Sequence, residues 1–132
     1  MNRRINNYSS DGTGGNINLN ILTEGSCEAC RIDAPMVPPD QMEDLLAALD
    51  GWNVKQPDGI KQLEKSFSFP SFTTAMEFLN LVGEAAEKED HHPTMLLEWG
   101  KVTVTWWSHK IGGLHMNDFI MAAKTDQIYR ST

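Results

Sequence analysis

The sequence predicts an α+β fold: a four-stranded antiparallel sheet with three helices packed on one face, in the order α-β-β-α-β-β-α. Two observations support this prediction. Segments with apolar residues at alternate positions occur in two pairs, each joined by a short turn, as in a β-hairpin. Longer segments with apolar residues at a spacing of about 3.6 flank and separate these pairs. A chain of 132 residues, 40% of them hydrophobic, fits one such domain.

The first helix and the first hairpin are expected in the first half of the chain. A helix is predicted from Pro39 to Leu49, because proline suits the first helical turn and apolar residues then recur at helical spacing. Gly51 ends this helix. Two strands, Trp52 to Gln56 and Ile60 to Phe69, are joined by Pro57-Asp58-Gly59, a strong turn signal.

The longest helix precedes the second hairpin. An apolar stripe predicts a helix from Phe72 to Asp90, which Pro93 prevents from continuing. The next strands are expected at Thr94 to Trp99 and Lys101 to Trp107, and a final amphipathic helix at Met116 to Tyr129.

The N-terminal segment has a different character. Residues 1–25 are rich in Asn, Gly and Ser and are expected to form a flexible tail, whereas residues 26–132 form a single domain. Cys27 and Cys30 make a lone C-x-x-C motif. A thioredoxin-type redox site would need a preceding strand, and a zinc site would need two more ligands. Reduced thiols are therefore the favoured interpretation.

The charge excludes several classes of partner. The net charge is -7 and the pI is near 4.9, whereas nucleic acids and anionic membranes attract basic surfaces. No apolar run approaches the roughly 20 residues of a membrane span, and no signal-peptide core is present. The sequence therefore predicts a soluble, cytoplasmic protein.

Three histidines and one acid are the candidate catalytic residues. His91 and His92 lie where the long helix ends, His109 follows the last strand, and Asp118 lies in the first turn of the last helix. The start and the end of paired antiparallel strands lie at one edge of a sheet, so these residues should converge. Histidine exchanges protons near neutral pH, and the cluster therefore predicts acid–base chemistry.

Each of these residues also has an ordinary explanation, such as a helix-end charge or an exposed turn residue. Glu87, four residues before His91, could support that imidazole or be a solvated helix acid. His115 is interpreted as a surface or capping residue. A metal site is less favoured, because adjacent side chains on extended backbone point to opposite sides, and no metal is expected.

The spacing of these residues resembles the pterin-4a-carbinolamine dehydratase family. The similarity extends from about Asp40 to Tyr129, and Met95 and His115 depart from the family pattern. It rests on Glu87-x-x-x-His91-His92-Pro93, Trp99, Val102-x-Val104, Ser108-His109, Gly113-Leu114 and Asp118, with Trp52, Phe67-x-Phe69 and Phe72-x-x-Ala75-x-x-Phe78 upstream.

The resemblance implies dehydration of 4a-hydroxytetrahydropterin to quinonoid dihydropterin without a cofactor. His91 and His109 would act as acid and base, in an order that the sequence leaves open, and His92 would bind and polarise the pterin. Asp118 would fix the tautomer of a neighbouring histidine, with His109 as the expected partner. The implied substrate-binding residues are Glu87, Ser108 through nearby backbone groups, and Trp106 or Trp107 as a wall of the pocket.

The resemblance also implies partners. Members of this family are typically homotetramers, built as dimers of dimers, and they act on the pterin of aromatic amino acid hydroxylases. A functional pairing with phenylalanine hydroxylase is therefore expected. The alternative is a non-catalytic interaction module, because animal relatives serve as the dimerisation cofactor of a transcription regulator. Redox function through Cys27 and Cys30 is the remaining alternative.

Overall fold

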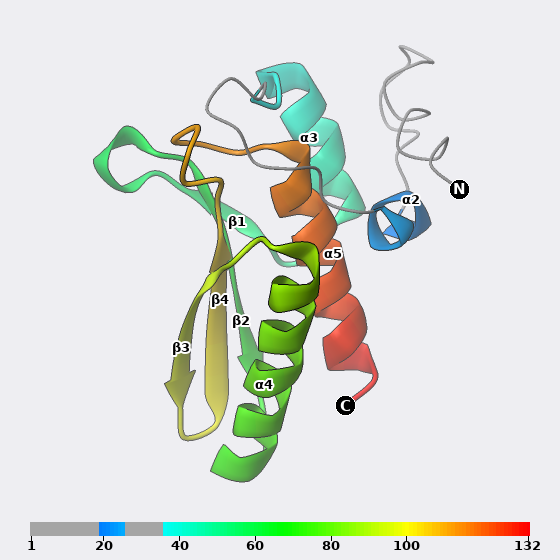
Figure 1. Ribbon diagram of the computed structural model, residues 1–132, viewed down its shortest axis with the longest axis vertical. Helices are drawn as coiled ribbons and strands as arrows, with labels where there is room; N and C mark the ends of the chain where they lie inside the picture. The colour runs from blue at the N-terminus through cyan, green and yellow to red at the C-terminus, as the bar shows by residue number, and fades with distance from the viewer. Residues whose placement is uncertain (1–18, 26–35) are drawn as a thin grey trace.

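The computed structural model describes residues 19–25 and 36–132 of the chain. From residue 39 onward the elements follow the predicted order α-β-β-α-β-β-α (Figure 1). Cys27 and Cys30 lie outside the described residues, as do residues 1–18 of the expected tail. The elements are α2 (Leu19–Glu24), α3 (Pro39–Ala48), β1 (Asn53–Lys55), a 3-10 turn (Pro57–Gly59), β2 (Gln62–Ser68), α4 (Phe72–Glu89), β3 (Thr94–Glu98), β4 (Lys101–Trp106) and α5 (Met116–Arg130).

The four strands form one antiparallel sheet in the order β1-β2-β4-β3. Its two central strands, β2 and β4, pair Leu63 with Trp106, whereas β3 and β4 pair Thr94 with Thr105. Figure 1 shows α4 and α5 side by side against one face of this sheet. The predicted fold class is therefore confirmed.

Both ends of α4 are set by local chemistry. Ser71 caps the N-terminus, and its hydroxyl accepts a hydrogen bond from the Thr74 N–H at 3.1 Å. At the other end Asp90 adopts a left-handed conformation with φ 53°, and the His91 N–H donates to the Ala86 carbonyl at 3.1 Å. This six-to-one bond is typical of the Schellman motif. It fixes the direction in which the chain leaves the helix at His91.

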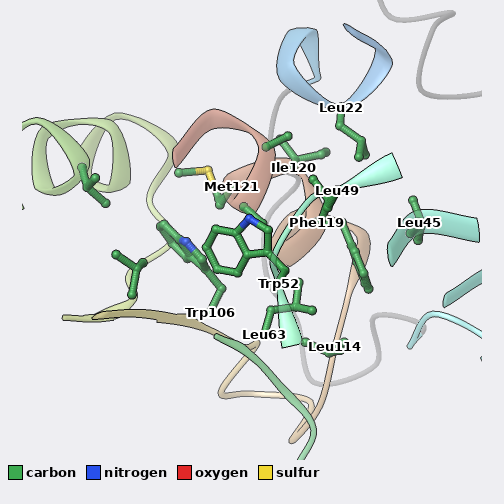
Figure 2. Packing of buried hydrophobic residues seen from close by; sticks show 14 of the residues in the cluster. Leu22, Leu45, Leu49, Trp52, Leu63, Trp106, Leu114, Phe119, Ile120 and Met121 are labelled. Carbon is green, nitrogen blue, oxygen red and sulfur yellow. The ribbon is translucent and has the colours of Figure 1, made fainter. Parts of the chain in front are cut away.

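The core lies between the sheet and the helices. Along β2, Leu63 and Phe67 are buried, as the alternating pattern predicts. Figure 2 shows Leu63, Trp106 and Phe119 packed together with residues from α3 and α5. At the far end of the sheet Phe67 contacts Phe78 of α4 and Tyr129 of α5, and Phe69, which directly follows β2, contacts the same two rings.

A buried ionic group links three segments of the fold. The ammonium of Lys65 lies 2.8 Å from Asp126 Oδ1 and 2.6 Å from the Asp50 carbonyl oxygen. The indole N–H of Trp52 donates to Asp126 Oδ2 at 3.0 Å. The partners of Asp126 compensate for taking its charge out of water, because a buried charge is tolerated only when paired.

The helix α2 corrects the expected tail. Residues 1–25 were predicted to be flexible, but Leu19–Glu24 form a helix that contacts α5. Leu22 is buried in the core, and Figure 2 shows it pointing toward the cluster that contains Ile120. The ammonium of Lys124 donates to the Thr23 carbonyl at 3.0 Å, near the end of α2. With α2 in place, α5 is buried on nearly every side for most of its length rather than amphipathic.

Among the described residues, no helix is both long enough and apolar enough to cross a membrane.

Candidate active site

The candidate catalytic residues lie at one end of the sheet. The connection from α4 to β3 carries His91 and His92, and the loop from β4 to α5 carries His109. Figure 1 shows the α4–β3 connection at the upper end of β3, with the β4–α5 loop above it, leading to the start of α5. The antiparallel register brings them there, since Thr94 at the start of β3 pairs with Thr105 near the end of β4.

Asp118 is the centre of a buried hydrogen-bond network. Its Oδ1 lies 2.7 Å from His91 Nε2, and its Oδ2 accepts from the Ser108 hydroxyl at 2.8 Å and from the His115 backbone N–H at 2.9 Å. Asp118 and Ser108 are 0% exposed and His91 is 6% exposed. Both carboxylate oxygens therefore have partners, as a buried acid requires.

The start of α5 places Asp118 in this network. His115 is the N-cap residue, and its Nδ1 accepts from the Asn117 N–H at 3.1 Å while Asp118 bonds back to the His115 N–H. This reciprocal arrangement is a capping box, with imidazole in the role that serine or threonine usually has. The expected capping position of His115 is confirmed, but the side chain is buried rather than at the surface.

Asp118 does not have the partner that the sequence suggested. His109 was the expected histidine, whereas the structure joins Asp118 to His91. The reason lies at the end of α4: the left-handed Asp90 and the bond from His91 to Ala86 turn His91 toward the interior. His109 instead stacks on Trp107, with ring centroids 4.3 Å apart and planes 30° apart.

Glu87 also differs from the expectation. It was interpreted as a support for His91, but its Oε1 lies 2.7 Å from His92 Nε2. Both members of this pair are exposed, with side chains 80% and 54% accessible. The chain leaves the helix after Glu89, so the i,i+4 geometry of a continuous helix no longer applies at His91.

The backbone and the hydroxyl of Ser108 are both hydrogen-bonded within the protein. Its backbone N–H donates to the Gly113 carbonyl at 2.9 Å, and its carbonyl accepts from the Gly112 N–H at 3.0 Å. The Ser108–Gly113 turn is therefore closed, and Gly112 adopts φ 64° within it. With its hydroxyl bonded to Asp118, Ser108 supports the acid, and the pterin contact through backbone groups near Ser108 stays a prediction.

Trp106 lies behind His91. The indole and imidazole rings are stacked, with centroids 5.6 Å apart and planes 15° apart, but Trp106 is 0% exposed and so does not line an open pocket as was suggested. Its Nε1–H donates to Thr125 Oγ1 at 3.1 Å. Thr125 was not among the residues expected at the site, although its position seven residues after Asp118 places both on one face of a helix.

This arrangement suits proton transfer. An ionised carboxylate has only acceptor atoms, so the hydrogen of a neutral His91 resides on Nε2 when it is bonded to Asp118. The lone pair is then on Nδ1, which is the nitrogen that can accept a proton. Two exposed imidazoles follow in the chain: His92 is adjacent to His91, and His109 is adjacent to Ser108.

Two surface cavities lie away from the histidines. One of about 600 Å³ is lined by residues of β2, α4 and the C-terminal end, including Phe69 and Tyr129. Another of about 390 Å³ lies between the start of α3 and the Gly112–Leu114 segment. Within residues 19–25 and 36–132, no three His, Cys, Asp or Glu side chains are grouped so that they could hold a metal ion.

Comparison with known proteins decides the family. The model of the family described as pterin 4 alpha carbinolamine dehydratase matches residues 35–128. The chain belongs to the pterin-4a-carbinolamine dehydratase family. Proteins from two strains of Vibrio vulnificus, YJ016 and CMCP6, are each 57% identical over 110 residues, which cover 83% of this chain and all of theirs. Both are named "Putative pterin-4-alpha-carbinolamine dehydratase".

Two solved structures share the dehydratase fold. A crystal structure titled as a transcriptional coactivator/pterin dehydratase from Brucella melitensis has a TM-score of 0.65 at 35% identity, covering 72% of this chain and 99% of that one. A pterin dehydratase-like protein, described as a RuBisCO assembly factor in the alpha-carboxysome, has a TM-score of 0.53 at 20% identity, covering 62% and 93%. The second similarity concerns the fold alone.

The family match includes every candidate site residue and excludes α2. Its range, residues 35–128, contains His91, His92, His109 and Asp118 together with Thr125. The helix Leu19–Glu24 precedes it. In this chain the dehydratase domain is therefore extended by a helix that packs on α5.

Proposed function

We propose that this protein catalyses the dehydration of 4a-hydroxytetrahydropterin (4a-hydroxytetrahydrobiopterin) to quinonoid dihydropterin, by histidine acid–base catalysis. The observation that carries the proposal is the hydrogen bond between His91 and Asp118, both buried, at the end of the sheet where His92 and His109 also lie. A histidine in such a pair has a fixed tautomer and orientation, which proton transfer requires. Membership of the family supports the same reaction class.

The reaction needs two proton transfers. The 4a-hydroxyl must receive a proton to leave as water, and N5 of the pterin must lose one. No covalent nucleophile or metal has to take part in these steps. His91 and His109 are proposed as the acid and the base, and His92, held by Glu87, as the group that binds and polarises the pterin.

Binding of the pterin is assigned to exposed rather than buried groups. Trp107 is half-buried and stacks on His109, so its indole can form a wall beside the reacting ring. Glu87 is exposed beside His92 and can bind polar edges of the heterocycle. Ser108 and Trp106 contribute indirectly, through Asp118 and His91 respectively.

The test is a dehydration assay coupled to phenylalanine hydroxylase, in which quinonoid dihydropterin formation is followed with and without this protein. His91→Ala, His92→Ala and His109→Ala should each lower the rate, by about 10²–10⁴ for a group that transfers a proton. Lys110→Ala, an exposed change beside His109, is the matched control and should leave the rate unchanged. Near-wild-type turnover in all three histidine variants would reject the proposal.

The same proposal places the protein in pterin recycling. The substrate is the pterin that an aromatic amino acid hydroxylase releases, so we propose a cytoplasmic role in phenylalanine metabolism, paired with phenylalanine hydroxylase. A faster steady-state rate of that hydroxylase in the presence of this protein would support the pairing, and an unchanged rate would argue against it.

A role in protein interaction is the second candidate. At the edge of the sheet Leu96 on β3 and Trp99 in the following turn are 57% and 70% exposed, and exposed apolar side chains on an edge strand favour pairing with another chain. We propose a homotetramer in which β3 strands extend the sheet across one interface. Light scattering after size exclusion should give four chains per particle, and Leu96→Lys should reduce that number. Binding to a different protein is a separate question, since the related Brucella structure is titled partly as a transcriptional coactivator.

A further inference from the structure

One face of α5 contacts His91 directly through Asp118 and indirectly through Thr125 and Trp106. Asp118 bonds the edge of the imidazole, and Thr125 bonds the indole of Trp106, on which the imidazole is stacked. Residues seven apart lie on the same side of a helix, because two turns take about 7.2 residues. The acid that orients His91 and the hydroxyl behind its stacking partner are therefore rigidly related.

We propose that Thr125 is a positioning residue for His91, acting through the indole of Trp106. The proposal rests on the proposed dehydratase function, in which His91 exchanges protons with the pterin. Thr125 itself is buried, and it bonds the Trp106 indole, which in turn stacks on the imidazole of His91.

The hydrogen bond to Thr125 constrains the orientation of the indole. The only polar group of a tryptophan ring is its N–H, which is a donor, and at 0% exposure Trp106 cannot donate it to bulk water. The Thr125 hydroxyl donates its own hydrogen to the Met121 carbonyl at 2.6 Å. That bond leaves an oxygen lone pair directed at the indole, 3.1 Å away.

Loss of the hydroxyl should be felt at His91. Without an acceptor the buried indole N–H would be unpaired, and a small rotation of the ring toward another acceptor would relieve the penalty. The imidazole of His91 lies nearly parallel to the indole, at 15°. Rotation of the indole would therefore disturb the stacking that orients the imidazole. A displacement of about 1 Å in a reacting group can cost about 10²-fold in rate.

The test compares Thr125→Val, which removes the hydroxyl at nearly constant shape, with Thr125→Ser, which keeps it. Thr125→Val should lower kcat by about 10- to 100-fold and change KM by less than about twofold, whereas Thr125→Ser should stay within about threefold of wild type. Val102→Ala, a core change at the other end of β4, controls for lost stability and should not alter kcat.

A second variant, Trp106→Phe, tests whether Thr125 acts on His91 through the indole N–H or through general packing. Trp106→Phe removes the N–H without leaving an unpaired donor, and should itself lower kcat by about tenfold. Adding Thr125→Val to Trp106→Phe should then change kcat by less than about twofold, because the hydroxyl has no N–H left to hold. Independent effects of the two changes would overturn the proposal, as would wild-type kcat in Thr125→Val or a failure of Thr125→Ser to restore the rate.

The ¹⁵N NMR signals of the His91 ring give a readout that does not depend on activity. They should shift in Thr125→Val and Trp106→Phe but not in Val102→Ala. An unshifted His91 ring in both variants would reject the positioning role. Absence of dehydratase activity in the wild-type protein would instead reject the proposed function, and the NMR result would still test the link between Thr125 and His91.

Discussion

Replacement of Asp118 by asparagine tests the role of the buried acid. Asp118 accepts hydrogen bonds from Ser108, from the His115 N–H and from His91 at 0% exposure. Each buried donor left without a partner costs about 1–3 kcal/mol, so Asp118→Ala would lose about 3–9 kcal/mol. That is of the order of the whole stability of a domain, about 5–15 kcal/mol, and Asp118→Ala is therefore a poor test.

Asp118→Asn keeps the shape and most of the bonds. The amide oxygen can still accept from Ser108 and His115, but the amide NH₂ then faces His91 Nε2, where an N–H already lies. Two donors cannot bond each other, so the His91 hydrogen should move to Nδ1. The nitrogen that can accept a proton changes with it.

The expected result is a large loss of kcat in a folded protein. A fall of about 10²–10⁴ corresponds to about 2.7–5.5 kcal/mol in the activation barrier. Steady-state dehydration at saturating pterin measures kcat, and ¹⁵N NMR of the histidine rings reports the tautomer. A folded Asp118→Asn protein with kcat within about threefold of wild type, or with an unchanged His91 tautomer, would refute the reasoning.

Three further predictions concern stability. The hydrogen bond from Lys55 lowers the pKa of Glu64 below its ordinary value of 4.5, although burial acts in the opposite direction. The ionised Glu64 therefore stabilises the fold fully above pH 4.5. This stabilisation is lost as the pH falls through the lowered pKa. Glu64→Gln should therefore cost up to about 1 kcal/mol at pH 7 in urea unfolding and nothing in strong acid; an equal cost at both pH values would contradict this. Lys65→Met should cost about 3–5 kcal/mol by leaving the buried carboxylate of Asp126 without its cation, visible as a lower Tm; an unchanged Tm would show that the pair adds nothing. Leu22→Ala should cost about 2–5 kcal/mol if α2 unfolds together with the domain, whereas faster hydrogen exchange in α2 alone would indicate local undocking.

Most of the fold could be predicted because its signals are local. The Pro57–Gly59 turn, the alternating residues of β2 and the serine before α4 each act within a few residues, and the structure has all three. The helix α2 could not be predicted in the same way. It is six residues long, too short to be stable alone, and Leu22 finds its burial only against other parts of the chain.

The residues of the candidate site were easier to predict than their pairing. Three histidines and an acid at one end of a sheet follow from topology. Which histidine meets Asp118 depends on one backbone conformation, the left-handed Asp90, and Asp90 is not a residue type that demands it. The bond from Trp106 to Thr125 joins residues 19 apart in different elements, and only the shared helix face with Asp118 hints at it.

The closed turn from Ser108 to Gly113 has a consequence for altering the protein. Backbone hydrogen bonds join Ser108 to Gly113 at 2.9 Å and to Gly112 at 3.0 Å, so the two ends of the turn are held together. Lys110 and Ile111 lie between these bonds, so their side chains can be exchanged without breaking either bond. A library confined to these two positions would vary the surface beside His109 while the bonds of Asp118 to Ser108 and His91 stay in place.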